Sequence, residues 1–256
     1  MTILIPKFFR EEIDPERRRF LIGALEAGIL GVGSAVSAEA AAFGIRPRKL
    51  ESGRNIYSLA GSASVNGAPI NADSVIRPGD TVETGADGRL IFAVADNAYI
   101  LRQRSHMVLP VEDDVSSALR LVTGVLLSVF GRRKRSLVTS AITIGIRGTG
   151  VYLESNPDES YVYTCFDTAD LIPTSSGEIE ETVQTEHHDA PRYAVAGATN
   201  GKSVREAPFK NHTDMEIALI ETLVGRSAPI QFTLDQFDSP LNSYQASRCR
   251  IGLGEI

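Results

Sequence analysis

Apolar and polar residues alternate with a period of two along most of the chain, from about residue 57 to residue 166. Because successive side chains of a β-strand point to opposite faces of a sheet, this pattern predicts half-buried strands. Turn signals interrupt it at close spacing, at Asn66-Gly67, Pro78-Gly79-Asp80 and Ala86-Asp87-Gly88. No helical stripe lies between them, so we expect a mainly β fold of antiparallel strands, arranged as a sandwich, a barrel-like sheet or stacked hairpins.

The individual strands can be placed from the same alternation. Asn66-Gly67 predicts a hairpin with a type I′ turn, since both residue types accept positive φ. Further strands are expected around residues 90–94, 99–101, 119–129, 142–146, 151–153 and 161–165.

One helix is predicted downstream, over residues 214–224. Thr213 and Glu216 form a capping box and Gly225 supplies the stop. We expect this amphipathic helix to dock on the sheet through its apolar side chains. Its acidic residues are expected to face solvent: Asp214, Glu216 and Glu221. The polar stretch 167–212 is expected to hold one or two strands, and the tail from Ser227 to be weakly ordered.

Composition excludes several classes of protein. The 256 residues are 43% hydrophobic and carry a formal net charge of -6, which argues against nucleic acid as the main partner. Only two cysteines are present and no CxxC pair occurs, which excludes a disulfide-dense miniprotein, a zinc-finger array and a thioredoxin-type dithiol. The length favours one domain, or one domain with an appendage.

The first residues are similar to a twin-arginine export signal. Arg17 and Arg18 precede Phe20 and Leu21, and a weakly apolar, Gly- and Ala-rich run follows to about Ala42. We therefore expect 1–42 to be a cleaved signal and the protein to be periplasmic or otherwise extracytoplasmic. The alternatives are an inner-membrane anchor through residues 20–43, which Glu26 disfavours, and a cytoplasmic amphipathic helix, which the glycines disfavour.

Four separated motifs resemble the FecR domain, in the order of that family. They are Gly61 to Gly67, Arg77 to Gly85, Leu119 to Gly124, and Val138 to Thr149, of which the last is the most recognisable. The resemblance covers about residues 56–171. It implies an extracytoplasmic, mostly β domain that takes part in protein interaction and envelope signalling, without catalysis.

The resemblance also has a departure. Regulators of that type place a sigma-factor-binding module before a membrane helix, whereas sixteen residues precede Arg17 here. A stand-alone exported FecR-like protein is therefore the expectation. It would comprise a signal (1–42), a FecR-like β domain (56–171) and a C-terminal extension (172–256) that holds the helix. The implied motif residues, structural or partner-binding, are Gly145, Arg147, Gly148, Thr149 and Gly150.

The three glycines of that motif admit two readings. They could form a phosphate-binding loop, but such a loop needs a following helix, and residues 151–154 look like a strand. A bulge or tight bend at Gly148 and Gly150 is favoured instead. Arg147 could hold a buried carboxylate, the favoured use, or face a partner.

Soft ligands and thiols are few. Cys165, His187, His188 and His212 are the candidates for a metal site, although adjacent histidines point to opposite faces of a strand. A Cys-His nucleophilic pair among them is a weaker alternative. Cys165 and Cys249 are candidates for a disulfide in an oxidising compartment.

The basic run Arg132 to Arg135 is expected to be a solvated hairpin connection, with contact to anionic lipid or an acidic partner as the alternative.

No catalytic motif is present and no cofactor is expected. The favoured function is a non-catalytic interaction and signalling module whose partner is an envelope protein, a glycan or a small ligand. A membrane partner is expected only if the N-terminal segment is retained. The alternative is a metal- or thiol-dependent redox or sensor protein that uses Cys165 and nearby histidines.

Overall fold

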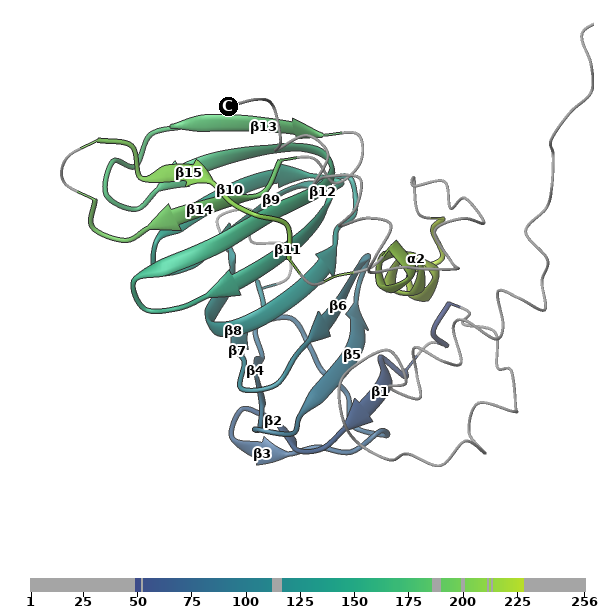
Figure 1. Cartoon of the computed structure of the whole chain (residues 1–256). Coiled ribbons are helices and arrows are strands. Elements are labelled where there is room, and N and C mark those ends of the chain that lie inside the picture. The colour runs from purple at the N-terminus through teal and green to yellow at the C-terminus, as the bar shows by residue number, and fades with distance from the viewer. Residues whose placement is uncertain are drawn as a thin grey trace, which may run out of the picture. The chain divides into compact units, whose positions relative to one another are not determined.

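The computed structural model describes residues 49–51, 53–111, 117–185, 190–198, 201–210, 212 and 214–227. These residues form a mainly β structure with one short helix (Figure 1). The strands are β1 (Ile56–Ala60), β2 (Ala63–Val65), β3 (Ala68–Pro69), β4 (Thr81–Thr84), β5 (Arg89–Val94), β6 (Asn97–Leu101), β7 (His106–Val108), β8 (Leu119–Val129), β9 (Lys134–Val138), β10 (Ile142–Arg147), β11 (Gly150–Ser155), β12 (Glu159–Pro173), β13 (Glu181–Thr185), β14 (Arg192–Val195) and β15 (Val204–Glu206). The helix is α2 (Asp214–Leu223).

Two sheets share the long strands β8 and β12. The first sheet has the order β1-β5-β6-β8-β11-β12-β14-β15. The second has the order β3-β2-β4-β7-β8-β9-β10-β12-β13. Because β8 and β12 each contribute one half to either sheet, the strand pairs β8-β11-β12-β10-β9-β8 form a closed circuit around the core. The predicted mainly β class is confirmed.

Two residues with positive φ mark where the shared strands change sheet. In β8 the corner is Gly124 (φ 97°), which pairs with Ser155 in the first sheet, whereas Thr123 pairs with His106 in the second. In β12 the corner is Asp167 (φ 69°), the first residue that pairs with β13. An L side chain rarely adopts this backbone conformation, and Asp is one of the residue types that tolerate it.

The core lies between the two sheets. Inward-facing residues of β5, β6, β8, β10, β11 and β12 alternate with outward-facing ones, as the period of two requires. Its fully buried members include Leu90, Phe92, Leu121, Ile144 and Leu153. Each such side chain contributes about 1.5–3 kcal/mol relative to an exposed one.

The outer face of the first sheet is also buried. Strand register places one row of side chains across it: Ile91, Ile100, Leu127, Tyr152 and Tyr163. None of them is more than 1% exposed. The helix α2 packs against β5, β6 and β8, beside which Figure 1 shows it. Residues 207–210 with His212, which we call the covering segment, lie over β11 and β12.

The helix bears out the predicted docking but not the predicted exposure of its acids. Ile217, Ile220 and Leu223 are buried as expected. Glu216 and Glu221, expected in solvent, are only 7% and 3% exposed. Both tolerate burial because arginines approach them: Arg102 and Arg89 at Glu216, and Arg226 at Glu221. Thr213, the predicted cap, lies outside the described residues.

Three other fold predictions are settled by the strand pairing. The hairpin at Asn66-Gly67 is present, with positive φ at both residues. The run Arg132 to Arg135 is not a hairpin connection, because β9 belongs to the second sheet, where it pairs in parallel with the beginning of β8. Residues 167–212 hold the second half of β12 and three further strands, more than expected, since polar edge strands show weak alternation.

Candidate functional site

The structure brings together two of the predicted soft-ligand residues. Cys165 Sγ lies 3.4 Å from His212 Nε2, although 47 positions separate them in the chain. Cys165 is the extra residue of a bulge, because Gly150 pairs with Phe166 and Val151 with Thr164. The bulge turns the thiol of Cys165 toward the covering segment. A thiol and an imidazole at this distance can share a proton.

Aromatic rings enclose this pair. His212 stacks on Tyr152, with ring centroids 5.0 Å apart and planes inclined by 17°. Tyr163 and Phe209 complete the enclosure, at 4.6 and 5.8 Å from the imidazole. Cys165 is fully buried and His212 is 7% exposed. Reagents therefore reach the thiol only when the covering segment moves.

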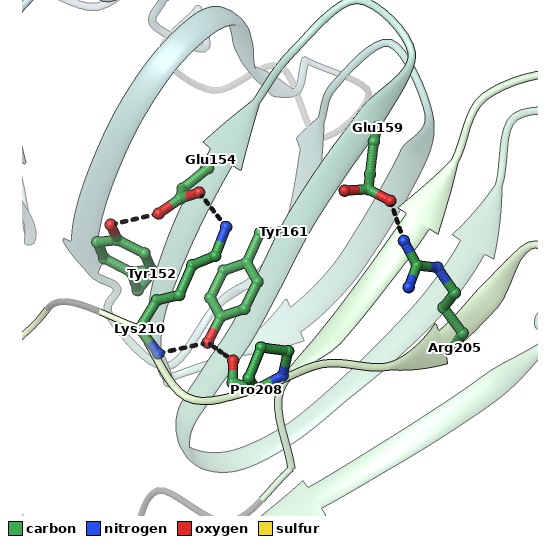
Figure 2. Close-up of polar contacts among 7 residues, drawn as sticks. All are labelled: Tyr152, Glu154, Glu159, Tyr161, Arg205, Pro208 and Lys210. Atoms are coloured by element: carbon green, nitrogen blue, oxygen red, sulfur yellow. Dashed lines mark hydrogen bonds and ion pairs between the residues drawn. The ribbon is translucent and has the colours of Figure 1, made fainter. Parts of the chain in front are cut away.

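Polar contacts hold the covering segment on the sheet (Figure 2). Lys210 Nζ donates to Glu154 Oε2 at 2.9 Å, and the Tyr152 hydroxyl donates to Glu154 Oε1 at 2.8 Å. The Tyr161 hydroxyl donates to the Pro208 carbonyl and accepts from the Lys210 amide, both at 3.1 Å. Each hydrogen bond of this kind contributes about 0.5–1.5 kcal/mol, so the set fixes the segment in place.

These environments shift the pKa values of the groups involved. Burial raises the pKa of the Tyr152 and Tyr161 phenols well above their ordinary range. Burial lowers the pKa of the Lys210 ammonium, but the hydrogen bonds and charge interactions with Glu154 and Tyr193 together outweigh burial and raise this pKa overall. Both tyrosines therefore stay neutral and Lys210 stays charged near neutral pH, as structural contacts require.

A second charged pair lies beside this cluster. Arg205 on β15 forms an ion pair with Glu159 on β12, as Figure 2 shows, and its guanidinium lies 4.5 Å from the centroid of Tyr193. The guanidinium of Arg192 on β14 donates to both carboxylate oxygens of Glu181 on β13, at 2.6–3.0 Å. Glu180 accepts from the amides of residues 203 and 204. These contacts join β14 and β15 to β13.

The predicted motif 145–150 forms the end of β10 and the turn into β11. Gly148 has φ 70° and a bulge follows Gly150, so both occupy the tight-bend and bulge positions that the sequence favoured. A strand, not a helix, follows the glycines. Thr149 is buried, and its hydroxyl donates to the Phe166 carbonyl. The motif therefore has the geometry of a strand connection and not of a phosphate loop.

Arg147 differs from its favoured prediction, because it holds no buried carboxylate. It is exposed at the end of β10 and forms no ion pair with any described residue. The alternation of β10 explains this, since Ile144 and Ile146 face the core and Arg147 must face outward. Its cross-strand neighbour is Lys134. With the exposed Arg132 and Arg133, these two side chains form what we call the basic platform.

Several predicted site residues lie outside the described residues. They are the export-signal residues Arg17, Arg18, Phe20 and Leu21, the ligand candidates His187 and His188, and the disulfide candidate Cys249. Within the described ranges, no group of three or more His, Cys, Asp or Glu residues is placed to hold a metal ion. No helix in the same part of the chain is both long and apolar enough to cross a membrane.

Sequence reasoning missed two features of this region. Glu154, Lys210 and Tyr161 carry no motif, because their partners lie about fifty positions away in the chain. The ion pair between Arg102 and Glu216 spans 114 positions. The available signal was the three tyrosines of β11 and β12, Tyr152, Tyr161 and Tyr163. A strand with one face in the core needs one row of large side chains, and these tyrosines add a second.

Comparison with known proteins finds no matching family model and no matching curated protein. Two solved structures of a "putative anti-sigma factor" from Parabacteroides distasonis ATCC 8503 are similar to the chain, at 9% and 10% sequence identity, each with a TM-score of 0.41. Both alignments cover 65% of this chain, and 91% and 90% of the solved chains. The resemblance to the FecR domain therefore stays a prediction from the motifs.

Proposed function

We propose that the chain is a non-catalytic, extracytoplasmic interaction and signalling module, similar to the FecR domain, that binds an envelope protein or ligand. The observation that carries the proposal is the position of Arg147. The motif that most resembles the family fixes its own turn through Gly148, Thr149 and Gly150, yet presents this arginine on the surface. A rigid scaffold that displays charged side chains at strand ends is typical of binding modules.

Photo-crosslinking in the native host tests the proposal. A photoreactive amino acid replaces Arg147, and the matched control replaces Lys202, which is exposed in the connection between β14 and β15. We expect the probe at position 147 to give one reproducible cross-linked species that the probe at position 202 does not give. The same products from both positions, or none from position 147, would contradict a specific partner face.

The contact between Cys165 and His212 favours a second candidate function, a thiol-dependent redox or sensor protein. The 3.4 Å separation allows the imidazole to stabilise the thiolate, which is the reactive form of cysteine. Elemental analysis of the purified chain and the rate of thiol labelling test this candidate. In the Cys249→Ser chain, a labelling rate that follows the same pH dependence as that of an unstructured cysteine peptide, with no bound metal, would reject it.

A further inference from the structure

Three turns meet beneath the basic platform and hold it rigid. The Gly131 amide, between β8 and β9, donates to Asn97 Oδ1 at the start of β6, next to the turn that follows β5, at 3.2 Å. The Phe130 amide donates to the Thr149 carbonyl in the turn between β10 and β11, at 3.1 Å. The backbone that carries the platform side chains is therefore hydrogen-bonded to elements of both sheets.

The platform places like charges directly opposite one another. Lys134 on β9 pairs in register with Arg147 on β10, and both side chains are exposed. Such a cross-strand pair of like charges is destabilising unless an anion lies between them. A Cβ at Gly148 would lie 3.3 Å from the Arg132 Cα, so the backbone of a third cation lies beside the residue that follows Arg147.

The acidic groups nearby do not neutralise this charge. Asp96 forms an ion pair with Arg135, at 3.5 Å, and among the described residues no carboxylate pairs with another cation of the basic run. Asp167, at the corner of β12, is exposed and forms no ion pair with a described residue. Arg132, Arg133, Lys134 and Arg147 likewise form none within the described part of the chain.

We propose that the basic platform is a docking surface for an acidic peptide segment of a partner protein, whose carboxylates insert between Lys134 and Arg147. This inference rests on the proposed function, since it names the chemistry of its partner. Arginine binds carboxylates through two parallel hydrogen bonds, which gives specificity as well as affinity.

The surroundings of the platform favour an acidic peptide over two other polyanions. Each cation near an anionic membrane surface contributes about 1 kcal/mol of attraction. Stable attachment of a protein also needs apolar groups that insert into the bilayer. The exposed large hydrophobic residues of the described chain are Val75, Val111, Val122 and Ile179, none of them in the platform. Single-stranded nucleic acid needs stacking platforms, and no aromatic residue lies among the platform residues.

Fluorescence anisotropy of labelled octaglutamate with the full chain tests the proposal, with octaglutamine as the uncharged probe. The platform variant is Lys134→Ser with Arg147→Ser. The control variant, Arg120→Ser with Lys202→Ser, removes the same charge from exposed sites away from the platform. We expect the platform variant to raise the Kd for octaglutamate about tenfold or more, and the control variant to change it less than about twofold.

The platform variant is also expected to be at least as stable as the wild type, because it removes the like-charge pair. Loss of binding is then not explained by unfolding, and thermal denaturation verifies this. Failure of the wild type to bind octaglutamate, or an equal loss in both variants, would overturn the proposal. Tighter binding to phosphatidylglycerol vesicles or to single-stranded DNA, lost in the platform variant, would overturn it in favour of those partners. If octaglutamate fails while position 147 still crosslinks a partner in the host, only the acidic chemistry is wrong.

Discussion

The Glu216 carboxylate on α2 lies 3.2 Å from the Arg102 guanidinium at the end of β6, and 3.6 Å from that of Arg89. The two arginines come from neighbouring strands and the acid from a helix more than a hundred positions later. This ion pair therefore anchors α2 to the outer face of the first sheet.

Replacing Glu216 by Gln is expected to lower the free energy of unfolding by about 1–3 kcal/mol, because two half-buried guanidinium groups lose their counter-charge. Burial lowers the pKa of Arg89, which shows that its charge already costs solvation. Chemical denaturation measures the change. Glu178→Gln, at an exposed position, serves as the control and should leave the stability unchanged. Equal effects of the two substitutions would contradict the anchoring role.

Gly124→Ala tests the corner of β8. A Cβ there would lie 2.4 Å from the Ser105 Cα, a backbone atom that cannot move away cheaply, and φ is 97°. We expect a loss of stability of about 3 kcal/mol or more, or failure to fold. Gly177→Ala isolates the cost of positive φ, since nothing lies within 4 Å of its Cβ position and φ is 68°. It should cost only about 1 kcal/mol. Similar losses in the two variants would show that the close approach at Gly124 is unimportant.

Stability is expected to fall in alkaline solution. Burial raises the pKa of the Tyr152 phenol above its ordinary value, so the unfolded chain releases this proton first as pH rises. The contribution of Tyr152 is therefore complete below about pH 10 and is lost as pH rises toward the folded pKa. Denaturation at several pH values above about 9 should give a smaller decline for Tyr152→Phe than for the wild type. Identical declines would contradict the burial of this phenol.

Access to the Cys165 thiol depends on the covering segment. In a Cys249→Ser background, an aromatic disulfide reagent should label the native chain slowly, because Cys165 is fully buried. Lys210→Met removes the contact with Glu154 and should raise the labelling rate severalfold. Lys202→Met, at an exposed site, is the matched control. Rates that do not differ between the two variants would show that Lys210 does not hold the segment.

Sequence reasoning succeeded where the determining interactions are local. Asn66-Gly67 specifies its own turn, and alternation alone places Ile144 and Ile146 in the core. It failed where the partner is distant in the chain. The solvent exposure expected for Glu216 was wrong because its arginines lie on strands that precede it by more than a hundred positions.

The same limit applies to the candidate site. Nothing near Cys165 in the sequence indicates His212, because a bulge at Gly150 and the path of the covering segment bring them together. The parallel pairing of β8 with β9 was missed for a similar reason, since it depends on the corner at Gly124. The exposure of Arg147, in contrast, follows from strand alternation, which outweighs the commoner use of an arginine between apolar residues.

The mass and compartment of the chain in its own host test the central claim, that it acts as an exported interaction module, most directly. The wild type is compared with a variant that carries Arg17→Lys and Arg18→Lys, which removes the arginine pair but keeps the charge. We expect a shortened wild-type chain in the extracytoplasmic fraction, and no such product from the variant. A full-length chain in the cytoplasm in both cases would contradict the proposed export.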